Sequence, residues 1–290
     1  MTCLVIGASG QLGSKIVDVL AEKFPYRQII STYNQYELPS YVDTGIQTVR
    51  LNLLEPNYQE IEQLVLDRES LIIFYCSALT NVDLCETNPE LGRAININGL
   101  VSIMKLFPSS HIVYFSADYV FDGQSGPYSE LDIPYPLQEY GKQKLIAEKI
   151  LQERHGKFSI IRTNMVWGSD LQKNNYSSRL IHSLSVQKEW FAADDEQVTP
   201  TFNKDLAEKS VEISLNDHRR IIHLAGNAIS TRYQFALDLA HTFNLNTDLI
   251  KPVSLKNLNK TAKRPIKGGL KSSFYSLRGY QEALCDYKNY

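Results

Sequence analysis

The stretch Gly7-Ala8-Ser9-Gly10-Gln11-Leu12-Gly13 decides the fold of this chain. It follows a short apolar run, Thr2–Ile6, and opens an amphipathic stretch, Gln11–Lys23, so it predicts a strand, a tight turn and a helix. Glycines in such a turn let the backbone approach a pyrophosphate, which then lies at the positive N-terminus of the helix. The sequence therefore predicts a dinucleotide-binding site at the start of the chain.

Five further apolar runs predict strands, and amphipathic stretches separate them. The runs are residues 28–32, 48–51, 71–76, 111–115 and 158–162. The later helical stretches are residues 58–67, 89–106 and 137–155, the last of which stops before Gly156. Strands that alternate with helices indicate βαβ units. The sequence therefore predicts an α/β fold, a Rossmann-type doubly wound parallel sheet that binds its ligand at the carboxyl ends of the strands.

The alternation weakens beyond about residue 165. Residues 174–186 and 230–243 have a helical pattern, and the segments between them are irregular and polar. We expect residues 1–165 to form a dinucleotide-binding domain and residues 166–290 to form mainly a smaller substrate lobe, from which about 203–225 return to the first domain. Residues 251–271 contain seven Lys or Arg and no acid. This segment is either a solvated loop face or a clamp for phosphates.

The composition excludes several classes of protein. The chain has 290 residues, of which 43% are hydrophobic and 21% charged, so disorder is excluded. A net charge of −2 gives no basic field for nucleic acid or a membrane surface. No apolar run approaches the ~20 residues of a membrane span, and no signal peptide is apparent, so we expect a cytoplasmic protein. Cys3, Cys76, Cys85 and Cys285 lack metal-site spacing and are expected to be reduced structural thiols.

Tyr140 and Lys144 lie four residues apart in the predicted helix at residues 137–155. Residues at this spacing share one face of a helix, so both side chains can address the same ligand. A phenol with an ordinary pKa of about 10 is a poor acid–base catalyst near neutral pH, and an adjacent ammonium lowers that pKa. We therefore expect Tyr140 and Lys144 to form a catalytic pair.

The end of the second strand reads Ser31-Thr32-Tyr33-Asn34 and carries neither an acid for a ribose 2′-hydroxyl nor an arginine for a 2′-phosphate. Because an uncharged strand end does not repel a 2′-phosphate, NADP(H) is the expected cofactor and NAD(H) is the alternative. The residues expected to bind it are Gly7, Ser9, Gly10, Gln11, Leu12, Gly13, Thr32, Asn52, Leu53, Cys76, Ser77, Ala78, Thr80, Tyr140 and Lys144.

The string Ser116-Ala117-Asp118-Tyr119-Val120-Phe121-Asp122-Gly123 resembles the STDYVFDG signature of the dTDP-4-dehydrorhamnose reductases, a branch of the extended short-chain dehydrogenases/reductases. The GxxGxxG spacing of the first turn is similar to that of the same family. Further similarities run along most of the chain. They are residues 78–86 with A-x-T-x-V-D-x-x-E, 94–99 with A-x-N-x-x-G, 161–163 with the LRT strand, 195–201 with DQ-x-x-x-PT, 230–236 with S-x-Y-x-F-A, and Arg264-Pro265 with the late RP.

The resemblance implies an enzyme that uses NAD(P)H to reduce the C4 ketone of a nucleotide-linked 6-deoxy-4-keto sugar. In this reading Tyr140 gives a proton to the ketone oxygen, Lys144 binds the nicotinamide ribose, and Asn96 holds a relay water and the helix geometry. The residues at substrate-pocket positions are Thr80, Val82, Ala117, Tyr119, Met165 and Arg264. The resemblance also implies a homodimer and a role in dTDP-rhamnose and cell-surface polysaccharide biosynthesis.

Four residues depart from the family pattern. Ala117 stands where the family has a Thr or Ser that hydrogen-bonds the substrate carbonyl. Ser116, the candidate catalytic stand-in, is adjacent, but side chains alternate along a strand, so it is expected to point away. Met165 replaces a sugar-stacking Trp, while Glu196 and Val198 replace the usual Gln and Gly.

These departures leave two other functions open. One is a non-catalytic, NADP-binding regulatory protein that resembles the β subunit of methionine adenosyltransferase. The other is a reductase or epimerase of a different nucleotide sugar, in which Met165 reshapes the pocket. Ala117 favours the regulatory protein, whereas intact Tyr140, Lys144 and Asn96 favour an enzyme.

Overall fold

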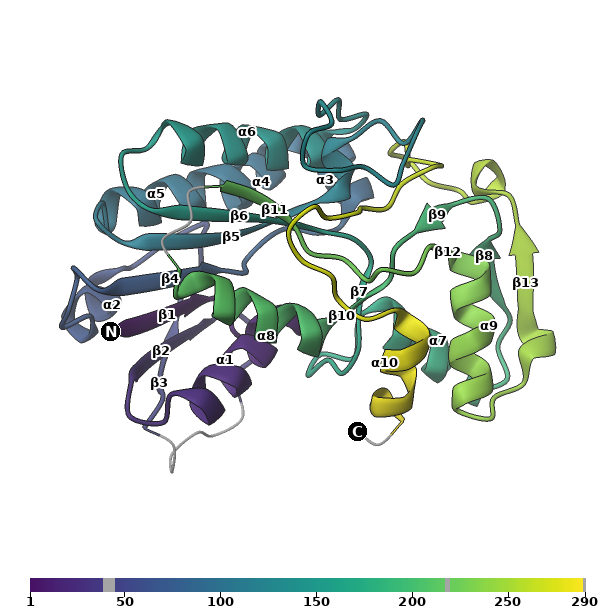
Figure 1. Cartoon of the computed structure of the whole chain (residues 1–290), viewed down its shortest axis with the longest axis horizontal. Helices are drawn as coiled ribbons and strands as arrows, with labels where there is room; N and C mark the ends of the chain where they lie inside the picture. The colour runs from purple at the N-terminus through teal and green to yellow at the C-terminus, as the bar shows by residue number, and fades with distance from the viewer. Residues whose placement is uncertain (39–44, 217–219, 289–290) are drawn as a thin grey trace.

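The computed structural model describes residues 1–38, 45–216 and 220–288, and a seven-stranded parallel sheet forms its centre (Figure 1). The strand order is β11-β6-β5-β4-β1-β2-β3. The strands are β1 (Thr2–Ile6), β2 (Gln28–Tyr33), β3 (Gln47–Arg50), β4 (Leu71–Tyr75), β5 (His111–Ala117), β6 (Phe158–Thr163) and β11 (Arg220–His223). All neighbouring strands pair in parallel. The predicted doubly wound sheet is therefore confirmed.

The order of the strands reverses between β1 and β4. The chain builds the sheet outward from β1 through β2 to β3, and then from β4 through β5 to β6 on the other side. The register pairs Ile6 with Tyr75 at the carboxyl ends of β1 and β4. In open α/β sheets the ligand crevice lies outside the carboxyl ends of the strands at this point of reversal. The glycine-rich turn after β1 and the segment after β4 therefore border the crevice.

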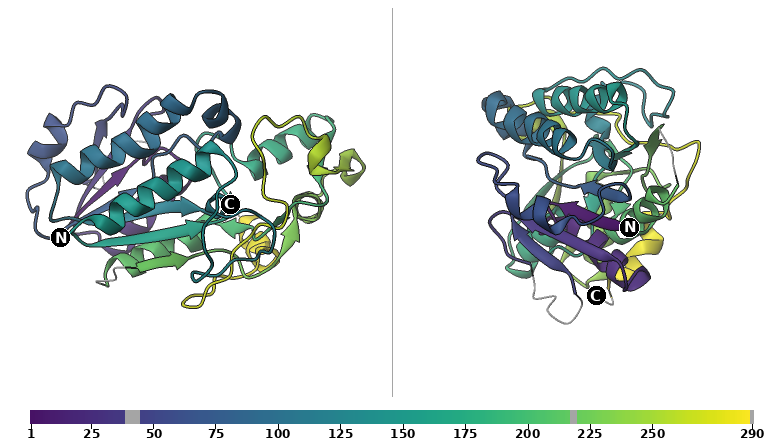
Figure 2. Two further views of the ribbon diagram at one scale, coloured as in Figure 1. Left: turned by 90° about the horizontal axis from the view of Figure 1, so that it is seen from above. Right: turned by 90° about the vertical axis from the view of Figure 1, so that its left-hand side faces the viewer.

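Helices cover both faces of the sheet (Figure 2). One layer contains α1 (Gln11–Lys23) and α8 (Asn203–Ser214), and the other contains α2 (Gln59–Leu64), α5 (Gly99–Leu106) and α6 (Glu139–Glu153). Because neighbouring residues of a strand point to opposite faces, each helix layer encloses its own apolar core. The long apolar runs of the strands are explained by this burial on both faces.

The predicted helix at residues 89–106 consists of three consecutive parts. It begins as α4 (Pro89–Arg93), continues as a π-helical turn over Ala94–Asn98 and ends as α5. The side chain of Asn88 caps α4 by accepting the backbone N–H of Leu91. A π-helical turn inserts an extra residue into a helix and is frequent at functional sites. This turn contains Asn96, one of the predicted catalytic residues.

The C-terminal part of the chain forms a smaller lobe at one end of the sheet (Figures 1 and 2). Its helices α7 (Tyr176–Ser185), α9 (Arg232–Thr242) and α10 (Tyr280–Tyr287) enclose a third core around the buried Trp167. Three two-stranded sheets complete the lobe. They pair β7 (Val166–Trp167) with β10 (Thr201–Phe202), β8 (Trp190–Ala193) with β13 (Ile250–Val253), and β9 (Gln197–Val198) with β12 (Ser230–Thr231).

Residues 203–225, apart from 217–219, which lie outside the described residues, contribute β11 to the main sheet and α8 to the helix layer on one of its faces. The domain division at residues 165 and 166 stays a prediction. Sequence patterns missed α8, α10 and α3 (Val82–Thr87). With six residues, α3 has fewer than two turns and no room for a periodic pattern.

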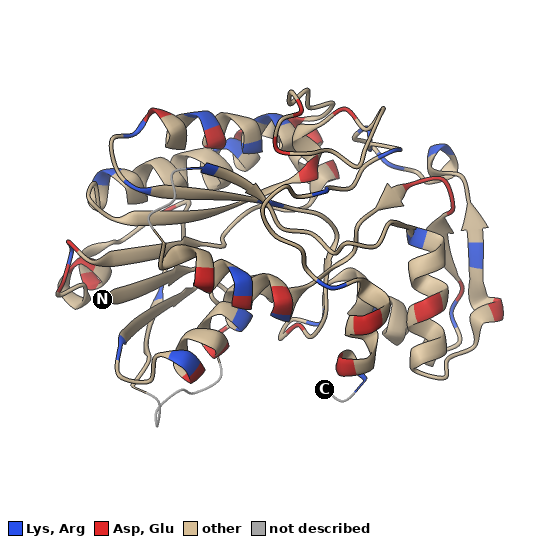
Figure 3. Ribbon diagram, in the orientation of Figure 1, with Lys and Arg blue, Asp and Glu red and all other residues tan. Residues whose placement is uncertain are grey.

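Charges of both signs are interspersed along the outer helices α6 and α8 (Figure 3). This mixture agrees with the formal net charge of −2. Within the described ranges, no helix combines the length and the apolar character needed to cross a bilayer.

Candidate functional site

Gly7 and Gly13 are required by close backbone contacts in the turn after β1. Gly7 has a φ of +80°, and a Cβ there would lie 2.9 Å from the backbone nitrogen of Ser77. A Cβ on Gly13 would lie 2.3 Å from the carbonyl oxygen of Gly7. These two glycines therefore allow β1, α1 and the segment after β4 to approach one another.

Gly10 differs from these two glycines because the space beside it is open. It is the N-cap of α1, and a Cβ there would meet only the carbonyl oxygen of Gly7, at 3.3 Å. No side chain caps this helix, so the first N–H groups of α1 are available to an anion at the positive end of the helix dipole. A pyrophosphate fits this position.

Thr32 holds the glycine-rich turn through two hydrogen-bond acceptors. Its Oγ1 accepts the N–H of Gly7 at 3.0 Å, and its carbonyl oxygen accepts the N–H of Ala8 at 2.7 Å. Thr32 still lines the crevice, and Tyr33 and Asn34 follow it along the wall. The part of the crevice beyond Thr32, where an adenosine ribose is expected, is therefore formed by these two residues.

Two adjoining cavities of about 170 and 390 Å³ lie beyond the carboxyl ends of β1, β2 and β4. Nine of the predicted cofactor residues line them: Gly7, Ser9, Gly10, Thr32, Asn52, Leu53, Cys76, Ser77 and Ala78. Gln11, Leu12 and Gly13 form the first turn of α1. Thr80, Tyr140 and Lys144 do not line these two cavities. The structure thus brings most of the predicted cofactor site together.

Three residues at or near these cavities carry no sequence motif. Asn34 and Gln172 line both cavities. Arg50 donates from Nε to the carbonyl oxygen of Asn34 at 3.3 Å. Pairing of β3 with β2 places Arg50 beside Tyr33, so an exposed guanidinium lies at a strand end that carries no charge of its own. Both Arg50 and Gln172 reach the site through long-range packing, which local patterns do not reveal.

Tyr140 and Lys144 share one face of α6, and both are buried, at 7% and 3% exposure. The Nζ atom of Lys144 donates to the carbonyl oxygen of Phe115 at 2.8 Å. It also lies 4.7 Å from the ring centroid of Tyr114 and 5.8 Å from that of Tyr140. Lys144 therefore connects the helix that carries the pair to the end of β5.

Burial changes the acidity of both groups. It lowers the pKa of Lys144 to about 8, although the nearby Glu148 carboxylate raises it. Burial also raises the pKa of Tyr140, and Tyr119 adds to this rise. The prediction of a lowered tyrosine pKa is therefore wrong for the protein without ligand, because desolvation of the phenolate is the largest effect on this pKa. Near neutral pH the phenol retains the proton that a ketone reduction consumes.

Asn96 connects the segment after β4 to α6. Its Oδ1 accepts the N–H of Leu79 at 2.8 Å, and its Nδ2 donates to the carbonyl oxygen of Leu79 at 3.3 Å. Nδ2 also donates to Oε1 of Gln143, at 2.9 Å. Gln143 lies between Tyr140 and Lys144 on α6, so Asn96 is tied to the turn of α6 that carries the pair. The relay water stays a prediction.

The side chains of Ser116 and Ala117 lie on opposite faces of β5. The Oγ of Ser116 is buried and has no hydrogen-bond partner among the described residues. Ala117 is half-buried and pairs in register with Thr163 of β6. The Oγ1 of Thr163 is also buried, and it too lacks a partner within the part of the chain that the structure covers. The departure at position 117 therefore leaves a methyl group at the end of β5.

Two predicted substrate residues, Tyr119 and Arg264, lie beside each other, and Tyr119 contacts Tyr140. The ring of Tyr119 packs edge-on against that of Tyr140, with centroids 5.7 Å apart. The guanidinium carbon of Arg264 lies 6.0 Å from the ring centroid of Tyr119, and Arg264 forms an ion pair with Asp83 at 2.9 Å. Tyr119 is therefore flanked by the phenol of Tyr140 and by a cation.

The other predicted substrate residues lie on separate segments. Thr80 is exposed, and Val82 is the first residue of α3. Met165 lies between β6 and β7 with a positive φ of 39°. Their contact with a substrate stays a prediction.

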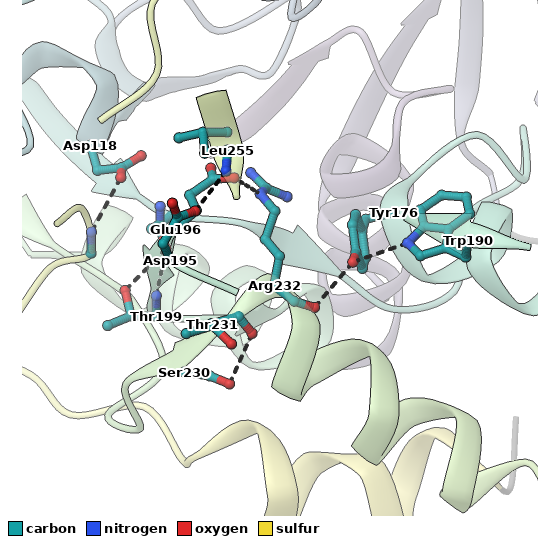
Figure 4. A network of polar contacts seen from close by, with 12 residues as sticks. Asp118, Tyr176, Trp190, Asp195, Glu196, Thr199, Ser230, Thr231, Arg232 and Leu255 are labelled. Atoms are coloured by element: carbon teal, nitrogen blue, oxygen red, sulfur yellow. Dashed lines mark hydrogen bonds and ion pairs between the residues drawn. The ribbon is translucent and has the colours of Figure 1, made fainter. Parts of the chain in front are cut away.

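An ion pair between the buried Glu196 and the half-buried Arg232 lies in the lobe (Figure 4). Oε2 of Glu196 accepts from Nε of Arg232, the first residue of α9, at 2.7 Å. The carbonyl oxygen of Arg232 accepts the hydroxyl of Tyr176 at 3.1 Å. Burial raises the pKa of Tyr119 to about 12, and the charges of Glu196 and Arg232 act on it in opposite directions. Glu196, which replaces the family's usual Gln, is therefore balanced by an arginine.

Asp118 is a second buried acid of this region. It lies between Ala117 and Tyr119 and is 3% exposed. Burial raises its pKa to about 6, although a hydrogen bond with the side chain of Asn164 lowers it. Its Oδ2 accepts the N–H of Gly269 at 3.4 Å. This carboxyl therefore titrates close to neutral pH.

The basic side chains of residues 251–271 do not all lie at one site. Arg264 lies beside Tyr119, whereas Lys251 lies 3.9 Å from Glu189 on the outside of the lobe. The phosphate clamp stays a prediction for Arg264. None of the four cysteines forms a disulfide within the part of the chain that the structure describes, and Cys76 lines one of the two adjoining cavities. Among the described residues, no group of three or more His, Cys, Asp or Glu is arranged to hold a metal ion.

A sequence model of the family described as RmlD substrate binding domain matches residues 1–287. The β subunit of methionine adenosyltransferase 2 from Xenopus laevis is 31% identical over 214 residues, which are 70% of this chain and 63% of that protein. The chain therefore covers less than two thirds of that relative. The probable low-salt glycan biosynthesis reductase Agl14 from Haloferax volcanii is 27% identical over 273 residues, or 91% of this chain and 88% of that protein.

The crystal structure of dTDP-4-dehydrorhamnose reductase from Bacillus anthracis in complex with NADP has the same fold. It superposes with a TM-score of 0.81 at 24% sequence identity and covers 99% of each chain.

Proposed function

This chain belongs to the RmlD substrate binding domain family, and on that premise we propose that it is an oxidoreductase that uses NAD(P)H to reduce the C4 ketone of a nucleotide-linked 4-keto-6-deoxy sugar. The observation that carries the proposal is the buried Tyr140 and Lys144 pair, held against β5 at the carboxyl end of a doubly wound sheet. The glycine-rich turn borders the same end of the sheet. A cofactor and a proton donor at one crevice are what ketone reduction needs.

The crevice fits a dinucleotide. The open side of Gly10 and the uncapped start of α1 suit a pyrophosphate. The two adjoining cavities, which extend from Ser9 to Asn34 and Leu53, provide room on either side of that position. When bound, the cofactor supplies hydride to C4 of the sugar.

Tyr140 supplies the proton. As hydride reaches C4, the C=O double bond becomes a C–O single bond, and its oxygen takes the phenolic proton of Tyr140. General acid catalysis of this kind contributes about 10²–10⁴-fold. The ammonium of Lys144 has three N–H groups, and the carbonyl oxygen of Phe115 accepts one of them. The other two are left to hold the ribose hydroxyls of the nicotinamide and to stabilise the phenolate that remains after proton transfer.

The expected cofactor is NADP(H), with NAD(H) as the alternative. Arg50 supports this choice because its guanidinium lies beside Asn34, where a 2′-phosphate of the adenosine is expected. An exposed cation there attracts a phosphate and does not contribute to binding of an uncharged 2′-hydroxyl.

A second candidate function is a dinucleotide-binding protein without reductase activity. Ala117 favours it, since a methyl group cannot donate a hydrogen bond to the developing alkoxide, and loss of one such donor costs about 10²–10³-fold in turnover. The similarity to a methionine adenosyltransferase β subunit supports a role as a partner protein. Met165 favours a third candidate, a reductase or epimerase of a different nucleotide sugar. The homodimer and the rhamnose and polysaccharide pathways stay predictions.

NADPH oxidation in the presence of dTDP-, UDP- and GDP-linked 4-keto-6-deoxy sugars separates these candidates. The reductase proposal expects turnover with at least one sugar, and a further increase of roughly tenfold in Ala117→Thr, which restores a hydroxyl. Ser116→Ala is the matched control and should leave the rate unchanged. NADPH binding without turnover in both wild type and Ala117→Thr would instead support the binding protein.

A further inference from the structure

A side chain of the C-terminal lobe reaches the glycine-rich turn. Gln172 lies in the loop between β7 and α7, and its Nε2 donates to the carbonyl oxygen of Ser9 at 3.1 Å. Ser9 directly precedes Gly10, the N-cap of α1. The amide of Gln172 therefore lies at the end of α1 where a pyrophosphate is expected.

The loop that carries Gln172 is held in place by its own hydrogen bonds. The carboxylate of Asp170 accepts the backbone N–H groups of Gln172, Asn174 and Asn175 at 3.1, 2.8 and 3.1 Å. Nδ2 of the buried Asn203 donates to the carbonyl oxygen of Ser169 at 2.6 Å, and its 3.4 Å contact with the carbonyl oxygen of Gln11 reaches α1. The position of Gln172 is thus fixed before any ligand binds, so little ordering entropy opposes a contact.

Gln172 also lines both cavities of the crevice, together with Ser9, Ser77 and Ala78. A carboxamide has two N–H donors and one acceptor oxygen. The contact with Ser9 uses one N–H group, which leaves a second donor and Oε1 at the wall of the cavities. These groups have the chemistry that a phosphate oxygen and a ribose hydroxyl require.

We propose that Gln172 binds the pyrophosphate bridge of the dinucleotide as a neutral contact supplied by the C-terminal lobe. This inference rests on the proposed dinucleotide binding and is independent of which sugar is reduced. Because the pyrophosphate is common to NADPH and NADH, Gln172 supports both cofactors equally. Arg50, in contrast, lies where only the 2′-phosphate of NADPH is expected.

Affinities of NADPH and NADH, measured by calorimetric titration of the full chain, test this assignment. Gln172→Ala should weaken both cofactors about tenfold, the value of one hydrogen bond to a charged group. Gln172→Glu keeps the size but adds a negative charge beside the pyrophosphate, so its loss should exceed that of Gln172→Ala. Asn174→Ala, an exposed position of the same loop, is the control and should bind both cofactors like wild type. Arg50→Ala should weaken NADPH alone.

Each outcome decides the inference. Unchanged affinity in Gln172→Ala, with a thermal midpoint like that of wild type, overturns it, as does tighter binding by Gln172→Glu. A loss confined to NADPH also overturns it, because the contact then lies at the 2′-phosphate. If wild type binds neither cofactor, the inference and the proposed function fail together. If the Gln172 variants behave as expected but no sugar is reduced, only the reductase proposal fails.

Discussion

Replacement of Gly10 with alanine separates ligand binding by the glycine-rich turn from its role in the fold. A Cβ at Gly10 would meet only the carbonyl oxygen of Gly7, at 3.3 Å, so the neighbouring backbone needs to yield by only a few tenths of an ångström. The residue has φ −78° and ψ 166°, which alanine adopts readily. We therefore expect Gly10→Ala to cost less than about 1 kcal/mol of unfolding free energy.

The added methyl group acts on the ligand. It occupies the space through which a pyrophosphate approaches the first N–H groups of α1, so at least one charge-assisted hydrogen bond is lost. Such a bond contributes roughly 1.5–3 kcal/mol, which corresponds to about 10–100-fold in the dissociation constant of NADPH.

Gly13→Ala is the matched variant, and it should affect the stability of the fold more than Gly10→Ala does. Its Cβ would lie 2.3 Å from the carbonyl oxygen of Gly7 and 2.8 Å from Cα of Ala8, so the backbone has to move. Overpacking of this kind costs about 1–3 kcal/mol, which lowers the thermal midpoint of a chain of this size by roughly 2–6 °C.

Calorimetric titration with NADPH and thermal unfolding without ligand measure the two effects on the same samples. The reasoning is refuted if Gly10→Ala binds NADPH like wild type, or if Gly10→Ala unfolds at a lower temperature than Gly13→Ala.

Four further variants test the catalytic pair and the buried charges. Tyr140→Phe should lower turnover about 10²–10⁴-fold with little change in NADPH affinity. Lys144→Met should lower both turnover and NADPH affinity. Steady-state kinetics measure the turnover, and calorimetric titration measures the affinity. Arg162→Met removes the partner of Glu148, whose carboxylate is 0% exposed and accepts Arg162 at 2.9 and 2.7 Å, so chemical denaturation should show a loss of about 3–5 kcal/mol. Asp118 has a pKa of about 6 in the folded protein against 3.8 for an unperturbed aspartate, so the folded protein favours the protonated carboxyl. The stability that this protonated carboxyl contributes is fully present below pH 3.8 and is lost as the pH rises through 6. Between roughly pH 4 and 7, the free energy of unfolding of Asp118→Asn should therefore rise by about 3 kcal/mol relative to that of wild type.

Each of these expectations has a clear contrary result. Equal losses of NADPH affinity in Tyr140→Phe and Lys144→Met would refute the division of roles. An Arg162→Met protein as stable as wild type would refute the stabilising role of the ion pair between Arg162 and Glu148. A stability difference between Asp118→Asn and wild type that does not change with pH would place the carboxyl pKa near its ordinary value.

Local patterns predicted the parts of this protein whose structure depends on near neighbours in the sequence. The bounds of β1 and α1 match the predicted ranges, because an apolar run, a glycine turn and an amphipathic stretch follow one another directly. The shared face of Tyr140 and Lys144 follows from their spacing alone. The short strands of the lobe have two to four residues and are defined by their partners, so no sequence period reveals them.

The parts of the site that the sequence did not predict depend on long-range packing. Pairing of β2 with β3 brings Arg50 beside Asn34 at the edge of the crevice, and Gln172 contacts Ser9, which is 163 residues away in the sequence. The ion pair of Glu196 with Arg232 joins residues that are 36 apart. The pKa of Tyr140 could not be foreseen for a similar reason, since its direction is set by how deeply the fold buries the ring.

Transfer of deuterium tests the central claim most directly. Wild-type protein is incubated with NADPH that carries deuterium at both C4 positions of the nicotinamide and with the 4-keto sugar that gives the fastest NADPH oxidation, and the sugar product is analysed by NMR. Reduction at C4 predicts one deuterium on that carbon and a C4 hydroxyl, formed about 10²–10⁴-fold more slowly by Tyr140→Phe. Oxidised cofactor without label in the sugar, label at another carbon, or an equal rate in Tyr140→Phe would contradict the account.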